Sequence, residues 1–295
     1  MNALTLRHIR YFEALSQHGH FGRAAEACGI SQPALSIQMK ELEDIVGSPL
    51  LERSARQVRL TGVGEVFLLR ARDILRAVDE LASLARTASE ELTGRVRVGL
   101  IPTVAPYLLP RVIRALAARF PDLDLRVREA VTQKLVNDLG EGRLDMAIVA
   151  LPTSEPSLVE HPLFTEEFVL VRPLADAGKP VPRPDLLREM RLLLLEEGHC
   201  FRDQALSFCK MSPPGPRDLM EASSLSTLVQ MVGAGVGITL IPQMAIETET
   251  RVAAVSVAPL EEPRPSRTIG LVWRRTNPLG KQFKTLLDVL KEAIS

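Results

Sequence analysis

Two of the three cysteines lie in one short stretch, residues 198–209, which reads G-H-C-F-R-D-Q-A-L-S-F-C. Cys200 stands between His199 and Arg202, and residues that tolerate a helix follow it. A thiol at the start of a helix and beside cationic side chains has its thiolate stabilised by the helix dipole and by the nearby positive charge. A peroxide converts a thiolate to a sulfenic acid, with which a second thiol condenses to a disulfide. The stretch therefore carries the residue types that thiol redox chemistry needs.

The second thiol, Cys209, follows nine positions after Cys200. If residues 201–209 are helical, the two cysteines are separated by about 13 Å of rise and face roughly opposite sides. A disulfide needs Cα atoms about 4.4–6.8 Å apart, so the bond can form only if the helix is rebuilt. Such a pair has the property of a switch. The alternative, that both are small buried hydrophobes, stays open. A metal site is not predicted, because His199 and the two cysteines match no closed zinc spacing.

The size and composition of the chain limit its class. Its 295 residues favour two or more domains, and 36 Lys and Arg balance 36 Asp and Glu, so nucleic-acid binding must come from local patches. No apolar run reaches the length of a membrane span, and the amino terminus lacks the pattern of a signal peptide. Three cysteines do not make a secreted disulfide framework. We therefore expect a cytoplasmic protein, in which a disulfide is transient and regulatory.

The first sixty residues read as helices joined by short breaks. A helix of small residues at 23–28 stops at Gly29, and Ser31 caps a second helix with Pro33 in its first turn. Two helices joined by a short turn containing glycine form the helix-turn-helix layout. Cys28, on the packed side of the first helix, is interpreted as a structural hydrophobe.

The second helix has an apolar face at Leu35, Met39 and Leu42. Another face is polar and mostly uncharged, which suits base edges and phosphates. The arginine-containing run L-L-E-R-S-A-R-Q-V-R-L-T that follows predicts a small hairpin, or wing, beside the DNA backbone. An ordinary helical hairpin with a solvated face is the alternative. The residues that we predict to contact DNA are Ser31, Gln32, Pro33, Ser36, Lys40, Arg53 and Arg56.

This segment resembles the winged helix-turn-helix of LysR-type transcriptional regulators. The residues that carry the resemblance are Phe21, Ala24, Ala25, Ser31, Gln32, Pro33, Ser36, Leu42, Glu43, Gly47, Leu50 and Arg53. The resemblance implies a DNA-binding dimer or tetramer with a long linker helix and a carboxy-terminal sensing domain. The expected organisation is a winged helix-turn-helix at 1–60, a linker helix at 61–93 and a regulatory domain at 94–295.

The expected linker helix, at residues 62–92, contains no proline. Its apolar residues alternate four and three apart, which predicts a heptad seam and pairing with a second copy of the same helix. Two-fold pairing would present two recognition helices to major grooves about one turn of DNA apart, or a multiple of this distance. A helix packed on its own domain is the alternative. The seam consists of Phe67, Ala71, Ile74, Val78, Leu81, Ala85 and Ala88.

From residue 95 onward, short strands alternate with helices. Strands are expected at 95–101, 123–129, 146–150, 168–171, 192–196, 238–241 and 268–273, and helices at 107–118, 133–139, 225–232 and 281–293. The alternation predicts an α/β domain with largely parallel sheets. Two lobes, about 95–163 with 268–295 and about 164–267, would match the periplasmic-binding-protein-like sensing domain that the resemblance implies.

Three segments, residues 99–110, 198–209 and 267–274, resemble the hydrogen-peroxide-sensing members of the LysR-type family. By that resemblance, Cys200 is the peroxidatic thiol and Cys209 the resolving thiol. The remaining site residues implied are Thr103, Thr132 and His199 lining a peroxide pocket, Arg267 favouring the Cys200 thiolate, and Asp203 in the surrounding polar network. The chain departs from its relatives at Phe201, which adds bulk beside the thiol, and at Pro213, Pro214 and Pro216, which stiffen the segment after Cys209.

We therefore predict a redox-responsive transcriptional regulator of the oxidative-stress response that consumes peroxide stoichiometrically. It is expected not to be an enzyme and to have no cofactor. The implied partners are double-stranded promoter DNA, hydrogen peroxide as the signal, RNA polymerase, and glutaredoxin- or thioredoxin-type reductants, with no membrane. A homodimer through the linker helices is expected. The resemblance implies a homotetramer, while the sequence itself leaves dimer and tetramer both open. One alternative is a LysR-type regulator that binds an organic metabolite between the lobes, near Thr103 and Thr132, with inert cysteines. Another is a thiol peroxidase, which would need no DNA-binding unit at residues 21–59.

Overall fold

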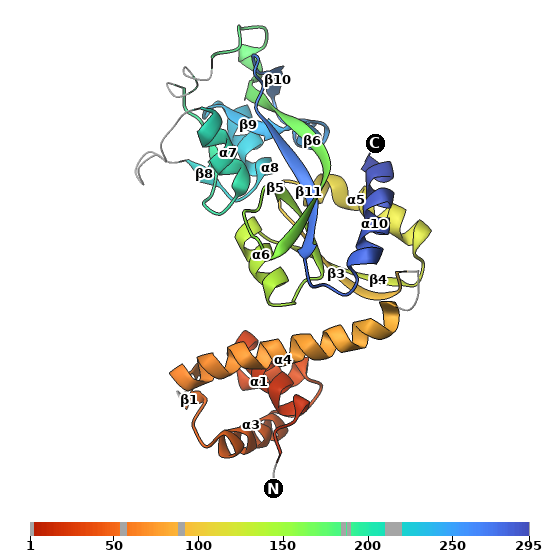
Figure 1. The fold of residues 1–295 in the computed structure, drawn as a ribbon. Coiled ribbons are helices and arrows are strands. Elements are labelled where there is room, and N and C mark those ends of the chain that lie inside the picture. Colours follow the sequence, from red (N-terminus) through yellow and green to blue (C-terminus); the bar gives the residue numbers. More distant parts are fainter. Residues whose placement is uncertain are drawn as a thin grey trace. The chain divides into compact units, whose positions relative to one another are not determined.

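The structure, a computed structural model, describes residues 3–53, 58–87, 92–183, 187, 190–209 and 220–294 (Figure 1). The chain forms two compact units, Met1–Ala85 and Arg86–Ser295. Within the described residues, no helix combines the length and the apolar character that crossing a membrane requires.

The first unit is a winged helix-turn-helix. Its elements are α1 (Leu6–His18), α2 (Phe21–Ala27), α3 (Gln32–Val46), β1 (Leu51–Arg53), β2 (Val58–Leu60) and α4 (Gly62–Thr87). Ser31 caps α3 by accepting a hydrogen bond from the backbone N–H of Ala34, and Gly47 ends that helix in the left-handed conformation. The strands β1 and β2 pair antiparallel, so the predicted hairpin is confirmed.

The core of this unit is built on the predicted apolar face of the second helix. Leu35, Met39 and Leu42 are buried against α1, where Phe12 is completely buried. Glu43 ties α3 to the wing, because its Oε1 accepts hydrogen bonds from the N–H groups of Leu50 and Leu51 at 2.8 and 3.1 Å. The recognition helix and the wing are therefore held in one rigid frame.

The helix α4 is described as far as Thr87, residues 88–91 of the predicted linker helix lie outside the described residues, and its apolar residues serve two purposes. Phe67 packs edge-to-face on Phe12 with ring centres 5.3 Å apart, and Ala71 is buried. At these two positions the helix therefore packs on its own domain, which was the alternative to a dimer seam. Ile74 and Leu81 are 42% and 67% exposed, and these two remain available to a partner. The Ala85 side chain and residue 88 lie outside what the structure describes.

The second unit alternates strands and helices. Its elements are β3 (Gly94–Leu100), α5 (Ala105–Arg119), β4 (Leu123–Glu129), α6 (Thr132–Gly140), β5 (Met146–Leu151), β6 (Leu158–Pro173), η1 (Leu174–Asp176), β7 (Leu194–Leu195), α7 (Cys200–Phe208), β8 (Glu221–Ala222), α8 (Leu225–Gly233), β9 (Thr239–Pro242), η2 (Gln243–Ala245), α9 (Ile246–Glu249), β10 (Val255–Pro259), β11 (Ser266–Arg274) and α10 (Gly280–Ile294).

The main sheet corrects the expectation of largely parallel strands. Its strand order is β10-β6-β11-β5-β3-β4, with β9 also paired to β6. Only β3 runs parallel to its neighbours β4 and β5, while β6 and β11 pair antiparallel with each other and with their other partners. Figure 1 shows β6 and β11 as long strands side by side. The prediction missed this because the pattern at 168–171 is only the carboxyl end of a strand that crosses from one lobe to the other.

Each lobe has its own apolar core. Lobe I packs β3, β5, α5 and α10 around residues such as Val98 and Phe283, and lobe II packs β6, α7, α8 and β9 around residues such as Phe168. Gly270 marks the point where β11 passes tightly between its neighbours. A Cβ atom there would lie 2.8 Å from the carbonyl oxygen of His161 and 2.3 Å from Leu151. The two crossing strands are therefore closely fitted at this point.

Candidate functional site

The polar face predicted to contact DNA is exposed on α3. Gln32, Pro33, Ser36 and Lys40 all lie on this surface, while Ser31 is occupied as the helix cap. Sequence reasoning missed Ile37, which is 66% exposed on the same helix and offers an apolar contact for a thymine methyl group. The Arg53 side chain and residue 56 lie outside what the structure describes, so their roles stay predictions.

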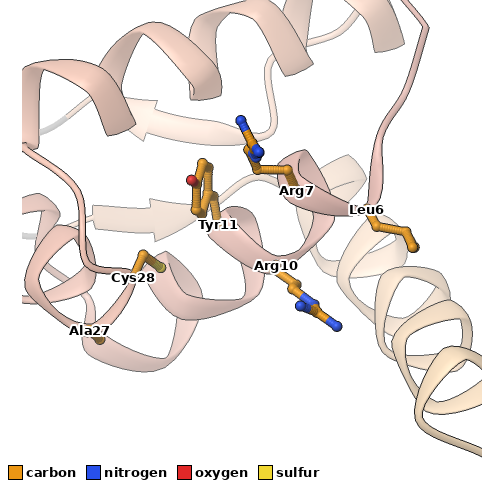
Figure 2. A pocket seen from close by; sticks show the side chains of 6 residues that line it. All are labelled: Leu6, Arg7, Arg10, Tyr11, Ala27 and Cys28. Carbon is orange, nitrogen blue, oxygen red and sulfur yellow. The ribbon is translucent and has the colours of Figure 1, made fainter. Parts of the chain in front are cut away.

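A small cavity of about 460 Å³ opens elsewhere in this unit (Figure 2). Cys28 lines it at the end of α2, half-buried beside α1. Burial raises the pKa of the Cys28 thiol, which keeps it protonated at neutral pH. The interpretation of Cys28 as a structural side chain, without redox chemistry, fits this environment.

In the second unit, the helix predicted between the two other cysteines is present. Cys200 is the first residue of α7, and Cys209 caps the carboxyl end by donating its N–H to the Ala205 carbonyl at 3.0 Å. The two thiols belong to different cores. Cys200 is half-buried against the core of lobe I, whereas Cys209 is completely buried in the core of lobe II. The reduced fold therefore holds the two sulfur atoms apart.

Burial also makes the two thiols chemically unequal. Removal from water raises the pKa of the Cys209 thiol to about 11. Since only a thiolate attacks efficiently, Cys209 is a poor nucleophile in this conformation. Opening α7 would return Cys209 to water and bring its pKa back toward that of an ordinary thiol.

His199 and Arg202, the two cationic neighbours predicted to activate Cys200, are both buried. His199 is buried, and desolvation lowers its pKa although Glu196 and Glu129 act in the opposite direction. His199 is therefore neutral at neutral pH. Arg202 is buried too, donating to the Leu195 carbonyl at 2.9 Å and forming an ion pair with Glu221. Neither residue gives Cys200 a free positive charge, and this part of the sequence argument was wrong.

Arg267 lies near the start of α7, and like Arg202 it is buried and ion-paired, so its effect on the Cys200 thiolate stays a prediction. Its guanidinium lies 5.2 Å from the ring centre of Phe201, the residue next to Cys200. It donates to Glu166 Oε1 through Nε at 2.9 Å, and to the Thr103 hydroxyl and carbonyl at 2.8 and 3.0 Å. Thr103 and Arg267 are thus brought together, as predicted. The Arg267–Glu166 pair was not predicted, because nothing in a strand pattern marks a buried carboxylate.

Thr132 carries an unsatisfied polar group. It is the first residue of α6, and its buried hydroxyl has no hydrogen-bond partner within the described structure. The turn before Cys200 lies against this helix, since a Cβ atom on Gly198, at φ +94°, would be 3.7 Å from the Val131 side chain. A small molecule with donor and acceptor groups could satisfy this hydroxyl.

Two further residues near the thiol behave differently from expectation. Phe201 points into the core of lobe II, 2% exposed, with its ring centre 4.7 Å from that of Phe168. It therefore anchors α7 and does not add bulk beside the thiol. Asp203 is exposed, and no hydrogen bond joins it to the part of the chain that the structure describes, so its place in a polar network stays a prediction. Residues 213–216 lie outside the described residues.

Family models and known proteins agree with this architecture. Residues 6–65 match the bacterial regulatory helix-turn-helix protein, lysR family, and residues 89–295 match the LysR substrate binding domain. The chain is 41% identical over 292 residues to the DNA-binding transcriptional dual regulator OxyR of Escherichia coli K12, covering 98% of this chain and 95% of that protein. It is 43% identical over 295 residues to a probable hydrogen peroxide-inducible genes activator of Streptomyces viridosporus, covering 98% and 94%.

Solved structures give the same result. A full-length OxyR variant from Pseudomonas aeruginosa superposes with a TM-score of 0.77 and 37% identity, covering 99% of this chain and 96% of that one. A hydrogen-peroxide-bound OxyR variant from Corynebacterium glutamicum has a TM-score of 0.66 and 36% identity, covering 99% and 93%.

The Arg202 contacts predict what holds α7 closed. Arg202→Ala leaves Glu221 without its ion-pair partner and the Leu195 carbonyl without its hydrogen-bond donor. Both losses favour opening of the helix. We expect Cys209 in reduced Arg202→Ala to react with a maleimide at least about tenfold faster than in the unmodified protein. Mass mapping gives the rate for each cysteine, with Cys28 as the internal reference. The exposed Arg191→Ala is the matched control, and equal Cys209 rates in both variants would contradict the anchoring role.

Proposed function

The chain belongs to the LysR family of bacterial transcriptional regulators, and from this premise we propose that it is a DNA-binding regulator switched by hydrogen peroxide through Cys200. Its curated relatives include proteins named as hydrogen peroxide-inducible genes activators. The observation that carries the proposal is the placement of Cys200 and Cys209 at opposite ends of α7 and in two different cores. Joining such a pair in a disulfide cannot leave the fold unchanged.

The first chemical step oxidises Cys200. Peroxide binds beside the Thr103, Thr132 and His199 side chains, where the unpartnered Thr132 hydroxyl can hydrogen-bond to it. The Cys200 thiolate attacks one peroxide oxygen, the O–O bond breaks, and the other oxygen leaves as hydroxide that takes a proton to become water. Arg267 and the amino terminus of α7 favour the thiolate form.

The second step forms the disulfide. Once α7 opens, the Cys209 sulfur attacks the sulfenic sulfur, and the hydroxyl group leaves as water after receiving the Cys209 proton. The rebuilt segment changes the packing between regulatory domains, and the DNA-binding units of the oligomer are repositioned at the promoter. Glutaredoxin- or thioredoxin-type thiols in the cytoplasm then reduce the disulfide, and RNA polymerase responds to the altered promoter contact.

Dimer formation rests on the exposed side of α4. Residues at spacings of three and four form an exposed stripe, interrupted by one arginine. Its apolar members are Val63, Val66, Ile74, Ala77 and Leu81. An isolated helix with this stripe is stabilised by pairing with a second copy.

The redox proposal predicts a specific crosslink. A near-stoichiometric dose of hydrogen peroxide should join Cys200 to Cys209 in a bond that dithiothreitol reverses, as seen by mass mapping. Cys200→Ser should prevent the crosslink, whereas Cys28→Ser should leave it unchanged. Free thiols at Cys200 and Cys209 after the dose would overturn the peroxide proposal and favour a regulator that binds a metabolite between the lobes.

The DNA interface predicts two different kinds of loss. Ser36→Ala should weaken binding to a fragment selected by the protein from a random library by about 1–3 kcal/mol, with little effect on unrelated DNA, because a base contact is removed. Lys40→Ala should weaken binding to both the selected fragment and unrelated DNA. It should also lower the slope of log affinity against log salt concentration by about one, because a phosphate contact is removed. Fluorescence anisotropy at several salt concentrations measures both, with Gln17→Ala on α1 as the control. Unchanged binding in both variants would place the interface elsewhere.

If the exposed stripe of α4 is the dimer seam, a charge placed in it should reduce the size of the oligomer. Leu81→Asp places a charge in the proposed seam and should reduce the oligomer to a smaller species in sedimentation velocity. Glu65→Lys, at an exposed position with no stripe member three or four residues away, should leave the sedimentation coefficient unchanged. The same coefficient for Leu81→Asp and the unmodified protein would exclude this seam.

A further inference from the structure

A second cavity, of about 1200 Å³, lies in the regulatory unit, and neither Cys200 nor Cys209 is among the residues that line it. The amino-terminal half of α5, the middle of β6, and the segment from η2 to just after α9 form its walls. Cys200, Thr103 and Thr132 do not line it. Its volume is sufficient for a metabolite-sized ligand, for which pockets of about 300–1,000 Å³ are typical.

The walls combine an apolar floor with two arginines from opposite lobes. Phe164, Met244 and Ile246 are half-buried apolar side chains of the floor. Arg111, on α5 of lobe I, and Arg251, after α9 of lobe II, are exposed and make no ion pair with the described part of the chain. An arginine without a partner beside apolar surface is suited to bind a carboxylate in bidentate fashion.

The carboxylates around the cavity restrict the charge of its ligand. Glu247 lines the cavity, so a multiply charged anion would meet repulsion. Glu166 also lines it, but its charge is already used by Arg267 and by the Met244 N–H at 3.2 Å. One negative charge on an apolar body therefore matches the lining better than a phosphate does.

The site is held in shape and connected to the thiol region. Tyr107 donates to Glu249 Oε1 at 2.7 Å across the lobes, which fixes α5 against α9. Glu166 is shared, since it lines the cavity and also binds Arg267, which donates to Thr103. A ligand that contacts both lobes here would stabilise one lobe arrangement, and Glu166 would transmit this to the predicted peroxide pocket.

We propose that this cavity is a second effector site that binds an amphipathic monocarboxylate between Arg111 and Arg251. Such a site would let a metabolite bias the lobe arrangement independently of peroxide.

The test uses the full-length reduced protein and isothermal titration calorimetry with 4-phenylbutyrate as the probe. We expect saturable binding that Arg111→Gln and Arg251→Gln each weaken at least about tenfold, because each removes a charge-assisted bidentate contact. The neutral analogue 4-phenylbutan-1-ol should bind at least about tenfold more weakly for the same reason. Arg114→Gln, an exposed arginine of α5 outside the lining, is the matched control and should stay within about twofold.

Three results would overturn the proposal: no binding of the probe, equal weakening by Arg114→Gln, or equal affinity for the alcohol. Repeating the titration in Cys200→Ser separates this site from the redox chemistry. Unchanged affinity in that variant is expected, so the cavity proposal stands or fails apart from the peroxide crosslink.

Discussion

The separation of two thiols by one short helix is the constraint on which the regulatory unit depends. Because α7 is nine residues long, its rise keeps Cys200 and Cys209 far beyond the distance of a disulfide. The helix is fastened by the Arg202–Glu221 pair and by Phe201 in the core of lobe II. Removing a side chain like Phe201 from the core costs about 1.5–3 kcal/mol, which formation of the proposed disulfide would have to exceed. These contacts stabilise the conformation in which both thiols are free.

The same helix links the two lobes, because its first residue packs on one core and its last on the other. The Arg267–Glu166 pair lies at the point where the crossing strands β11 and β6 run side by side. Arg267 touches Phe201 on one side and Thr103 on the other. A change at the start of α7 therefore has a direct route, through packed and hydrogen-bonded groups, to the junction of the lobes.

Local patterns in the sequence predicted most of the elements but not their connections. The helix-turn-helix followed from Gly29, Ser31 and the spacing of Leu35 and Met39, all of which act within a few residues of the chain. The direction of β6 and β11 did not, since strand pairing depends on contacts far apart in sequence.

The charges near Cys200 likewise depend on contacts between residues that are far apart in the sequence. Because Arg202 is close to Cys200 in the sequence, we predicted that its charge acts on the thiol. In the structure Arg202 pairs with Glu221, nineteen positions away. The partner of a buried arginine is chosen by the fold, because an unpaired charge cannot stay buried. Sequence adjacency therefore located the thiols but not the ion pair that Arg202 forms.

The unequal burial of the thiols orders the chemistry. Cys200 is within reach of a small oxidant, while Cys209 is protonated and enclosed, with its pKa raised to about 11. If both were exposed thiolates, either could be oxidised first, and partial oxidation would leave the helix intact. In the proposed switch, the second sulfur would become reactive only when α7 leaves its core, so bond formation and the change of fold would occur together. Under that proposal, the burial that protects Cys209 would couple disulfide formation to the opening of α7.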